Sequence, residues 1–186
     1  VGYTLPHCPF VAPKELFDYY YDRVEIPERE EHLPAAVSRY LDYREILDPP
    51  LEPERVRVAL AAYYGLCEHI DALIGEVLSC LEDCGFTDNT MVVYCSDHGE
   101  QAGQHGCWWK STYYEGSAGV PLLVKWPGIS AENSVKEDIC NLIDLAPTFA
   151  DAAKTEFPYP IDGRSLLPVL NGSLKVDWDN TTFSEL

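Results

Sequence analysis

A polar, glycine-rich loop between two short apolar runs carries most of the side chains that could do chemistry. Asp97 and His98 directly follow the first run, and His105 and Lys110 stand further along the loop. A carboxylate beside an imidazole can bind a divalent cation, although two ligands do not complete a site. Lys110 supplies a point cation for an anionic substrate group. These residues also allow a plainer interpretation, a surface loop with an incidental Asp–His pair.

The apolar pattern on either side of the loop predicts the elements that position it. Residues 91–95 and 120–124 are short apolar runs without alternation. Such runs are typical of strands covered on both faces, as in a parallel sheet. Because ligands bind beyond the carboxyl ends of strands in open α/β sheets, Asp97 and His98 lie where a site is expected.

A long helix is predicted over residues 54–84, between Pro53 and Gly85. Its apolar residues recur every three or four positions: Leu66, Ile70, Leu73, Ile74, Val77, Leu78 and Leu81. This stripe is expected to cover one face of the sheet. The fold class is therefore α/β, with a mainly parallel sheet flanked by helices.

After the second strand, three further elements are expected. Leu145 to Ala153 is predicted to be a helix with Asp144 as its N-cap. Leu166 to Leu170 is expected to form one helical turn, and Thr181 to Ser184 could begin a strand.

The first 53 residues are predicted to be irregular, because their recurrent prolines interrupt helices and ladders alike. The aromatic residues at 17 and 19–21 are expected to pack this long excursion against the sheet. Loops of this length in a compact domain are usually functional or inserted. His7 stands between two prolines that hold its backbone extended, and a lone histidine is more often structural than catalytic.

Composition limits the partners. The chain has 186 residues, a single-domain length, and its net charge of -18 disfavours binding to nucleic acid. No run approaches the roughly 18 apolar residues of a membrane span, so no membrane partner is expected.

Seven scattered cysteines favour reduced thiols in the cytoplasm. Two glycosylation-type triplets, at 171–173 and 180–182, favour a secretory route, so the compartment stays open.

Residues 96–128 read SDHGEQAGQHGCWWKSTYYEGSAGVPLLVKWPG. This segment closely resembles the sulfatase family of the alkaline-phosphatase-like superfamily. Four more segments are similar to sulfatase segments in the same order, at residues 2–10, 63–75, 144–149 and 162–166. The Asp-His form, with two tryptophans before Lys110, resembles the branch of the choline-sulfatases and iduronate-sulfatases.

The resemblance implies a role for each candidate residue. Asp97 and His98 correspond to the family's second pair of metal ligands, and Lys110 to the lysine that bridges sulfate and nucleophile. His7 corresponds to the histidine that contacts the sulfate or the leaving oxygen. His105 is a substrate-pocket candidate. The implied cofactor is a divalent metal ion, Ca²⁺ with Mg²⁺ and Mn²⁺ as alternatives, and the implied substrate is a sulfated small molecule or sugar.

Three sulfatase features have no counterpart in this sequence. They are the Cys/Ser-x-Pro-Ser-Arg segment that yields the formylglycine nucleophile, the first pair of metal-binding aspartates, and the C-terminal subdomain. Residues 1–186 are therefore expected to be part of an alkaline-phosphatase-like catalytic domain. Residues 1–53 would form a substrate-side excursion, and residues 54–186 would form part of the α/β core.

This incomplete set leads to expectations for the isolated chain. It should be inactive by itself and bind metal weakly, with formylglycine supplied by missing sequence. Uncovered apolar surface should favour self-association. Two other functions remain open: a phosphonate or phosphodiester hydrolase of the same superfamily, and a non-catalytic binding or scaffold piece.

Overall fold

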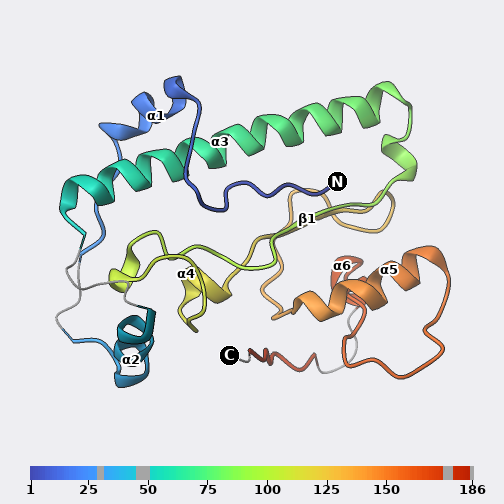
Figure 1. Ribbon diagram of the computed structural model, residues 1–186. Helices are drawn as coiled ribbons and strands as arrows, with labels where there is room; N and C mark the ends of the chain where they lie inside the picture. The colour runs from blue at the N-terminus through green and yellow to red at the C-terminus, as the bar shows by residue number, and fades with distance from the viewer. Residues whose placement is uncertain (29–31, 45–50, 174–177, 185–186) are drawn as a thin grey trace. The chain divides into compact units, whose positions relative to one another are not determined.

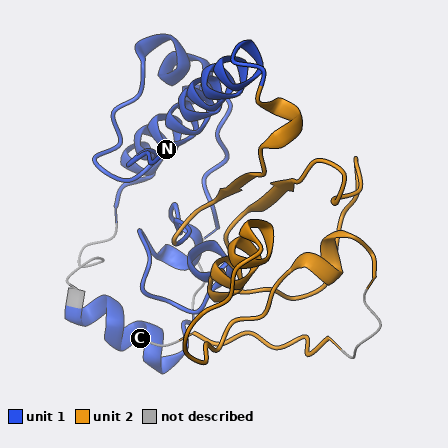
Figure 2. Ribbon diagram, turned by 90° about the vertical axis from the view of Figure 1, so that its right-hand side faces the viewer, with its two compact units in different colours: residues 1–85, 98–119 blue, residues 86–97, 120–186 orange. Residues whose placement is uncertain are grey.

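The computed structural model describes residues 1–28, 32–44, 51–173 and 178–184, and its backbone separates into two compact units. Unit 1 comprises residues 1–85 and 98–119, and unit 2 comprises residues 86–97 and 120–186 (Figure 2). The chain therefore leaves unit 1, returns to it for residues 98–119, and leaves it again.

The longest element of unit 1 is helix α3, Pro53–Asp83, which confirms the predicted helix (Figure 1). Proline occupies the first turn, and Gly85 follows the C-cap residue Cys84, as the sequence indicated. The buried residues fall in the first two thirds of the helix: Leu60, Ala61, Ala62, Gly65, Leu66 and Ile70. The predicted stripe is therefore only partly right. Further along it, Val77 and Leu78 are 37% and 44% exposed.

Two helices, α1 (Lys14–Tyr21) and α2 (Ala35–Arg44), lie in the stretch predicted to be irregular, so that prediction is wrong for the described part. Its portions at 29–31 and 45–50 lie outside the described residues. The reason is the position of the prolines. Pro13 is the N-cap residue of α1, and Pro34 directly precedes α2, where a missing N–H costs no helical hydrogen bond.

Helix α1 packs on α3 and forms the small core of unit 1 (Figure 1). The core residues Val24, Leu60 and Ala61 are covered by Phe17, Tyr20, Tyr21, Val56 and Ala102. The aromatic residues thus pack against a helix, and the expected packing against the sheet is wrong. Two tyrosines also reach α3 carboxylates, since Tyr20 Oη donates to Glu68 at 2.7 Å and Tyr21 Oη donates to Glu54.

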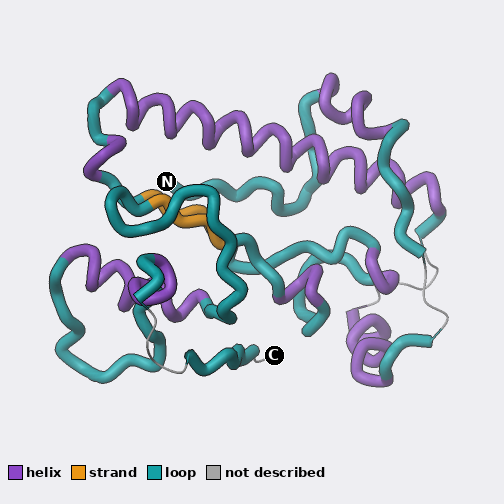
Figure 3. The backbone as a smooth tube through the Cα atoms, turned by 180° about the vertical axis from the view of Figure 1, so that it is seen from behind, coloured by secondary structure: helices purple, strands orange, loops and turns teal. Residues whose placement is uncertain are grey.

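In unit 2, strands β1 (Val92–Cys95) and β2 (Leu122–Lys125) form at the two predicted apolar runs, and they pair side by side (Figure 3). The pairing is antiparallel, with Val92 opposite Lys125, so the predicted parallel arrangement is wrong for these strands. A parallel pair needs a crossover, usually a helix. The connection here contains only the single turns η2 (Gln104–Gly106) and α4 (Glu115–Ala118).

The rest of unit 2 holds short helices (Figure 1). Helix α5, Leu145–Ala153, matches the predicted bounds, and α6, Leu167–Leu170, is the predicted turn. Two 3₁₀ turns, η1 (Thr87–Asn89) and η3 (Leu142–Asp144), precede β1 and α5. The expected strand at 181–184 is absent, because these described residues have no regular structure.

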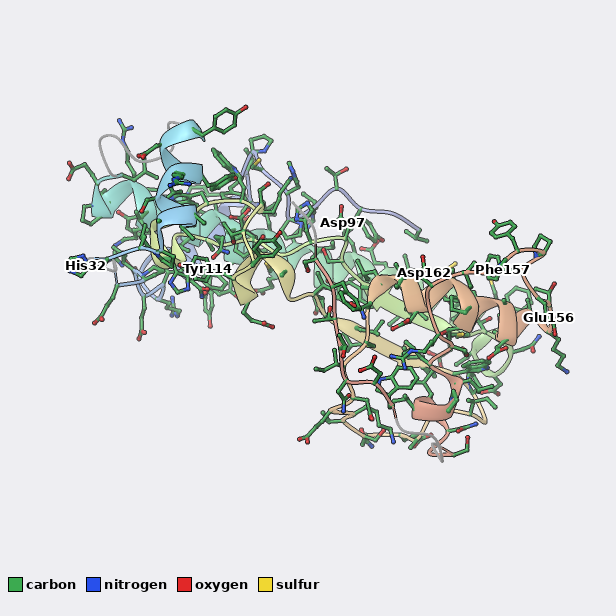
Figure 4. The ribbon with its side chains drawn as sticks, turned by 90° about the horizontal axis from the view of Figure 1, so that it is seen from below. His32, Asp97, Tyr114, Glu156, Phe157 and Asp162 are labelled. Atoms are coloured by element: carbon green, nitrogen blue, oxygen red, sulfur yellow. The ribbon has the colours of Figure 1, made fainter. Side chains whose placement is uncertain are left out.

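Asp144 precedes α5 as predicted, but its side chain does not cap that helix. It is 3% exposed, and its carboxylate accepts hydrogen bonds from the backbone N–H groups of Asn141 and Arg164, each at 2.8 Å. Thr148 adds a second link, because its hydroxyl donates to the Asp144 carbonyl at 2.6 Å and accepts from the Leu166 N–H at 2.8 Å. These contacts join α5 to the 162–166 segment. Asp162, labelled in Figure 4, begins that segment, which lies in the loop after α5.

Within the described ranges, no helix combines the length and apolar character needed to cross a bilayer.

The seven cysteines are all free thiols, but their surroundings differ. Cys80 and Cys84 are exposed, whereas Cys107 has no exposed surface. Burial also raises the pKa of the Cys67 thiol, which lowers its thiolate fraction at any given pH.

We expect a thiol reagent at pH 8 to modify Cys80 and Cys84 first, Cys67 slowly, and Cys107 only after unfolding. Mass spectrometry of the labelled peptides measures this order. Equally fast labelling of Cys107 and Cys80 in the folded chain would contradict it.

Candidate functional site

Lys110 and His7 meet in unit 1 although 103 positions separate them in the sequence. The Lys110 Nζ atom lies 2.8 Å from the His7 Nε2 atom, which is hydrogen-bond distance. The histidine side chain is exposed and the lysine is half-buried. An incoming anion can therefore reach the pair from solvent.

The hydrogen bonds of His7 define which of its ring nitrogens carries a proton. Its Nδ1 atom lies 2.8 Å from the Cys8 carbonyl oxygen, and a carbonyl only accepts, so Nδ1 is the donor. Nε2 then accepts the hydrogen bond from the Lys110 ammonium group, which has no lone pair. The pair in this arrangement is a neutral imidazole with a lysine cation, and it carries one positive charge.

His98 lies beside this pair. Its ring centroid is 6.0 Å from that of His7, with the rings at 66°. The His98 Nδ1 atom lies 2.8 Å from the Gly99 carbonyl oxygen, so Nδ1 again carries the proton and the lone pair of the neutral ring is on Nε2. This tautomer is the one that metal-binding histidines use when Nδ1–H is held by a carbonyl.

Asp97 directly precedes His98 in the chain and is exposed (Figure 4). It is the last residue of unit 2 before the chain returns to unit 1. Its pairing with His98 as a metal ligand stays a prediction that rests on their adjacency in sequence.

The described residues do not form a complete metal site. Nowhere in them do three or more His, Cys, Asp or Glu side chains gather closely enough to hold an ion. A calcium ion takes six to eight oxygen ligands, whereas Asp97 and His98 offer one carboxylate and one imidazole. The pair fits a part of a coordination sphere at most.

His105 has a left-handed backbone, with φ of 54°, and its ring stacks on that of Tyr114. The ring centroids are 3.9 Å apart and the planes are inclined by 13°. This stacking gives His105 a packing role inside the loop. A role in a substrate pocket stays a prediction.

Gln101 and Glu100 hold the loop that carries Lys110 in shape through hydrogen bonds within it. The sequence analysis did not identify either residue. Gln101 is completely buried, and its Nε2 atom donates to the Thr112 hydroxyl at 2.6 Å. The Glu100 carboxylate accepts from the backbone N–H groups of Ala102 at 3.1 Å and Trp109 at 2.5 Å. Polar residues in a glycine-rich loop suggest exposure to solvent, so the sequence gives no signal that these side chains turn inward.

The start of this loop leaves no space for a side chain at Gly99. A Cβ atom there would lie 2.2 Å from the Gly116 carbonyl oxygen, and the Gly99 N–H donates to the Ser117 carbonyl at 2.8 Å. Gly99→Ala must therefore displace either the backbone at residue 99 or the backbone at residues 116–117, which the hydrogen bond from Gly99 to Ser117 joins. We expect it to lower the free energy of unfolding by about 1–3 kcal/mol.

The matched control for Gly99→Ala is Gly75→Ala in helix α3. A Cβ atom at position 75 meets nothing within 4 Å, and alanine is the better helix former by about 1 kcal/mol. Urea unfolding of both variants tests the difference. The prediction fails if Gly99→Ala is as stable as the unchanged protein.

The family model described as Sulfatase matches residues 5–155. The chain is 38% identical over 137 residues to arylsulfatase K of Xenopus laevis, covering 74% of this chain and 25% of that protein. It is 31% identical over 185 residues to choline-sulfatase of Rhizobium meliloti (strain 1021), covering 92% of this chain and 35% of that protein. The chain thus spans about a quarter to a third of the length of these relatives.

Solved structures agree on the fold. A phosphonate monoester hydrolase from Silicibacter pomeroyi superposes with a TM-score of 0.76 at 31% identity, over 93% of this chain and 37% of that chain. A structure solved with its substrate D-glucosamine-2-N,6-O-disulfate superposes with a TM-score of 0.64 at 28% identity, over 92% of this chain and 36% of that chain. These similarities confirm the predicted α/β, alkaline-phosphatase-like fold class, of which this chain contains a part.

Proposed function

The chain belongs to the sulfatase family, and on that premise we propose that its loop 96–119 and His7 form the sulfate-binding part of a sulfuric-ester hydrolase. The observation that supports the proposal most directly is the 2.8 Å contact between Lys110 and His7. Two residues from distant parts of the matched region meet, and the resemblance implies a sulfate contact for each of them. Their cation–imidazole pair suits an anion that enters from solvent.

The proposed chemistry of the pair follows from its hydrogen bonds. The Lys110 ammonium group has three N–H donors, of which one points to His7, so the others can bind sulfate oxygens. Negative charge that develops during S–O cleavage would be stabilised by this fixed cation. When the lysine turns to the sulfate, His7 Nε2 can take up a proton from solvent and then, as an imidazolium, donate it to the leaving oxygen.

The metal and the nucleophile belong to the same proposal. We assign Asp97 and His98 as two ligands of a divalent cation, with Ca²⁺ implied by the family resemblance and Mg²⁺ or Mn²⁺ as alternatives. The other ligands would come from elsewhere, as would the formylglycine nucleophile. The bound ion would supply Lewis-acid polarisation of the sulfate oxygens.

The substrate class is proposed as a sulfated sugar or small molecule. The solved relative bound to a disulfated glucosamine supports the sugar, and the similarity to choline-sulfatase supports a small molecule.

The second candidate function is phosphonate monoester hydrolysis, favoured by the Silicibacter pomeroyi structure. A cytoplasmic location, suggested by seven free thiols, and self-association remain proposals.

The test is a direct comparison of two substrates in a catalytically complete protein that contains this sequence. We expect a larger kcat/KM for p-nitrophenyl sulfate than for a phenylphosphonate monoester. The opposite order would favour the second function. Hydrolysis of neither substrate, by protein shown by mass spectrometry to carry formylglycine, would favour a binding or scaffold role.

A further inference from the structure

Lys110 lies between two residues with an unusual backbone. Trp109 has φ of 65° and Ser111 has φ of 74°, in the left-handed region that residues other than glycine rarely adopt. Such conformations persist only where surrounding contacts hold them in place. The contacts on either side of Lys110 therefore decide where its ammonium group points.

The contacts on the N-terminal side come from the start of the same loop. The Trp109 N–H donates to the Glu100 carboxylate at 2.5 Å, and the Trp109 carbonyl accepts from the Gln101 N–H at 2.8 Å. The same Glu100 oxygen accepts from the Ala102 N–H at 3.1 Å. One half-buried carboxylate thus closes the loop onto the residue before Lys110.

The contact on the C-terminal side comes from a different element. Tyr40, on helix α2, donates its hydroxyl proton to the Lys110 carbonyl oxygen at 3.0 Å, and the contact is partly buried. The two residues are 70 positions apart, and both belong to unit 1. A residue of the proline-rich first segment therefore holds the peptide group between Lys110 and Ser111.

We propose that Tyr40 and Glu100 are positioning residues that fix the backbone on both sides of Lys110, so that its Nζ atom reaches His7 and an anion beside it. The part of this proposal that concerns an anion rests on the proposed function. The part that concerns the contact between Lys110 and His7 does not. Through Tyr40, helix α2 would help to position Lys110 without contacting the substrate itself.

Two pairs of variants test the proposal in the 186-residue chain. Tyr40→Phe removes one hydroxyl, and Tyr43→Phe, on the same helix and 83% exposed, is its matched control. Glu100→Ala removes the carboxylate, and Glu100→Gln keeps an acceptor oxygen. The readouts are the NMR signals of the His7 imidazole and the affinity for inorganic sulfate.

We expect Tyr40→Phe and Glu100→Ala to move the His7 signals in the direction that Lys110→Ala moves them. Both should weaken sulfate binding by about 3- to 10-fold, because each variant loses a hydrogen bond that holds the backbone beside Lys110. Tyr43→Phe should match the unchanged chain, and Glu100→Gln should restore most of the affinity. A merely structural role for Tyr40 would alter stability and leave the His7 signals unchanged.

The two layers of the proposal fail separately. If Lys110→Ala moves the His7 signals but Tyr40→Phe and Glu100→Ala leave them unchanged, the positioning roles are overturned. If Lys110→Ala leaves sulfate affinity unchanged, the proposed sulfate site is wrong, and the His7 signals still judge the positioning roles. If Glu100→Ala fails to fold, Tyr40→Phe decides, because it deletes a single oxygen atom.

Discussion

Lys110→Ala is expected to lower kcat/KM for a sulfate ester about 100-fold or more, measured in a catalytically complete protein that contains this sequence. The variant removes the only positive charge of the Lys110–His7 pair and leaves a neutral imidazole in its place. That charge is expected to matter most in the transition state, so kcat should fall more than KM rises. Steady-state kinetics at several substrate concentrations separate the two effects.

The control for this variant is Lys125→Ala. Lys125 is an exposed lysine on β2, and its removal changes the net charge equally. We expect its kcat/KM to stay within about twofold of the unchanged enzyme, since exposed single charges act weakly through screened solvent. Equal losses in the two variants would indicate a general charge effect and would remove Lys110 from the proposed site.

The largest expected loss of stability follows Asp144→Ala. The Asp144 carboxylate is 3% exposed and accepts two backbone N–H groups, from Asn141 and Arg164. Alanine leaves both partly buried donors without that acceptor, at about 1–3 kcal/mol each. We therefore expect the free energy of unfolding to fall by about 3 kcal/mol, measured by urea denaturation.

Two further variants make the Asp144 result specific. Asp144→Asn keeps one acceptor oxygen and should lose about half as much stability. Asp151→Ala, at an exposed position of α5, should change the free energy of unfolding by less than about 0.5 kcal/mol. A loss below about 1 kcal/mol for Asp144→Ala would show that the two N–H groups find other acceptors.

Periodicity predicted the long elements well because they depend on local sequence. Helix α3 begins at the predicted proline, and α5 has the predicted bounds. The direction of the strands could not be predicted in this way, because an apolar run of four or five residues suits either pairing. Only the connection decides, and its single-turn helices bring the chain back antiparallel.

The candidate site could also be predicted only in part from the sequence. From the residues alone, Asp97, His98 and Lys110 were compatible with an incidental surface loop, and a lone His7 was more plausibly structural. The family resemblance implied a sulfate-site role for each of His7 and Lys110, and these roles stay predictions. The structure adds a 2.8 Å contact between the two side chains. Neither line of reasoning found Tyr40 or Glu100, because hydrogen bonds to backbone groups leave no pattern in a single sequence.

The interrupted course of unit 1 has a consequence for how the site forms during synthesis. Residues 98–119 return to residues 1–85 only after the chain has begun unit 2. At about 5–20 residues per second, a ribosome makes His7 roughly 5–20 seconds before Lys110. During that interval, residues 1–85 lack the contacts that residues 98–119 later make with them. Their contact then closes a ring of 103 residues, whose entropic cost grows only with the logarithm of its length. The Lys110–His7 pair is thus one of the last parts of unit 1 to assemble on the nascent chain.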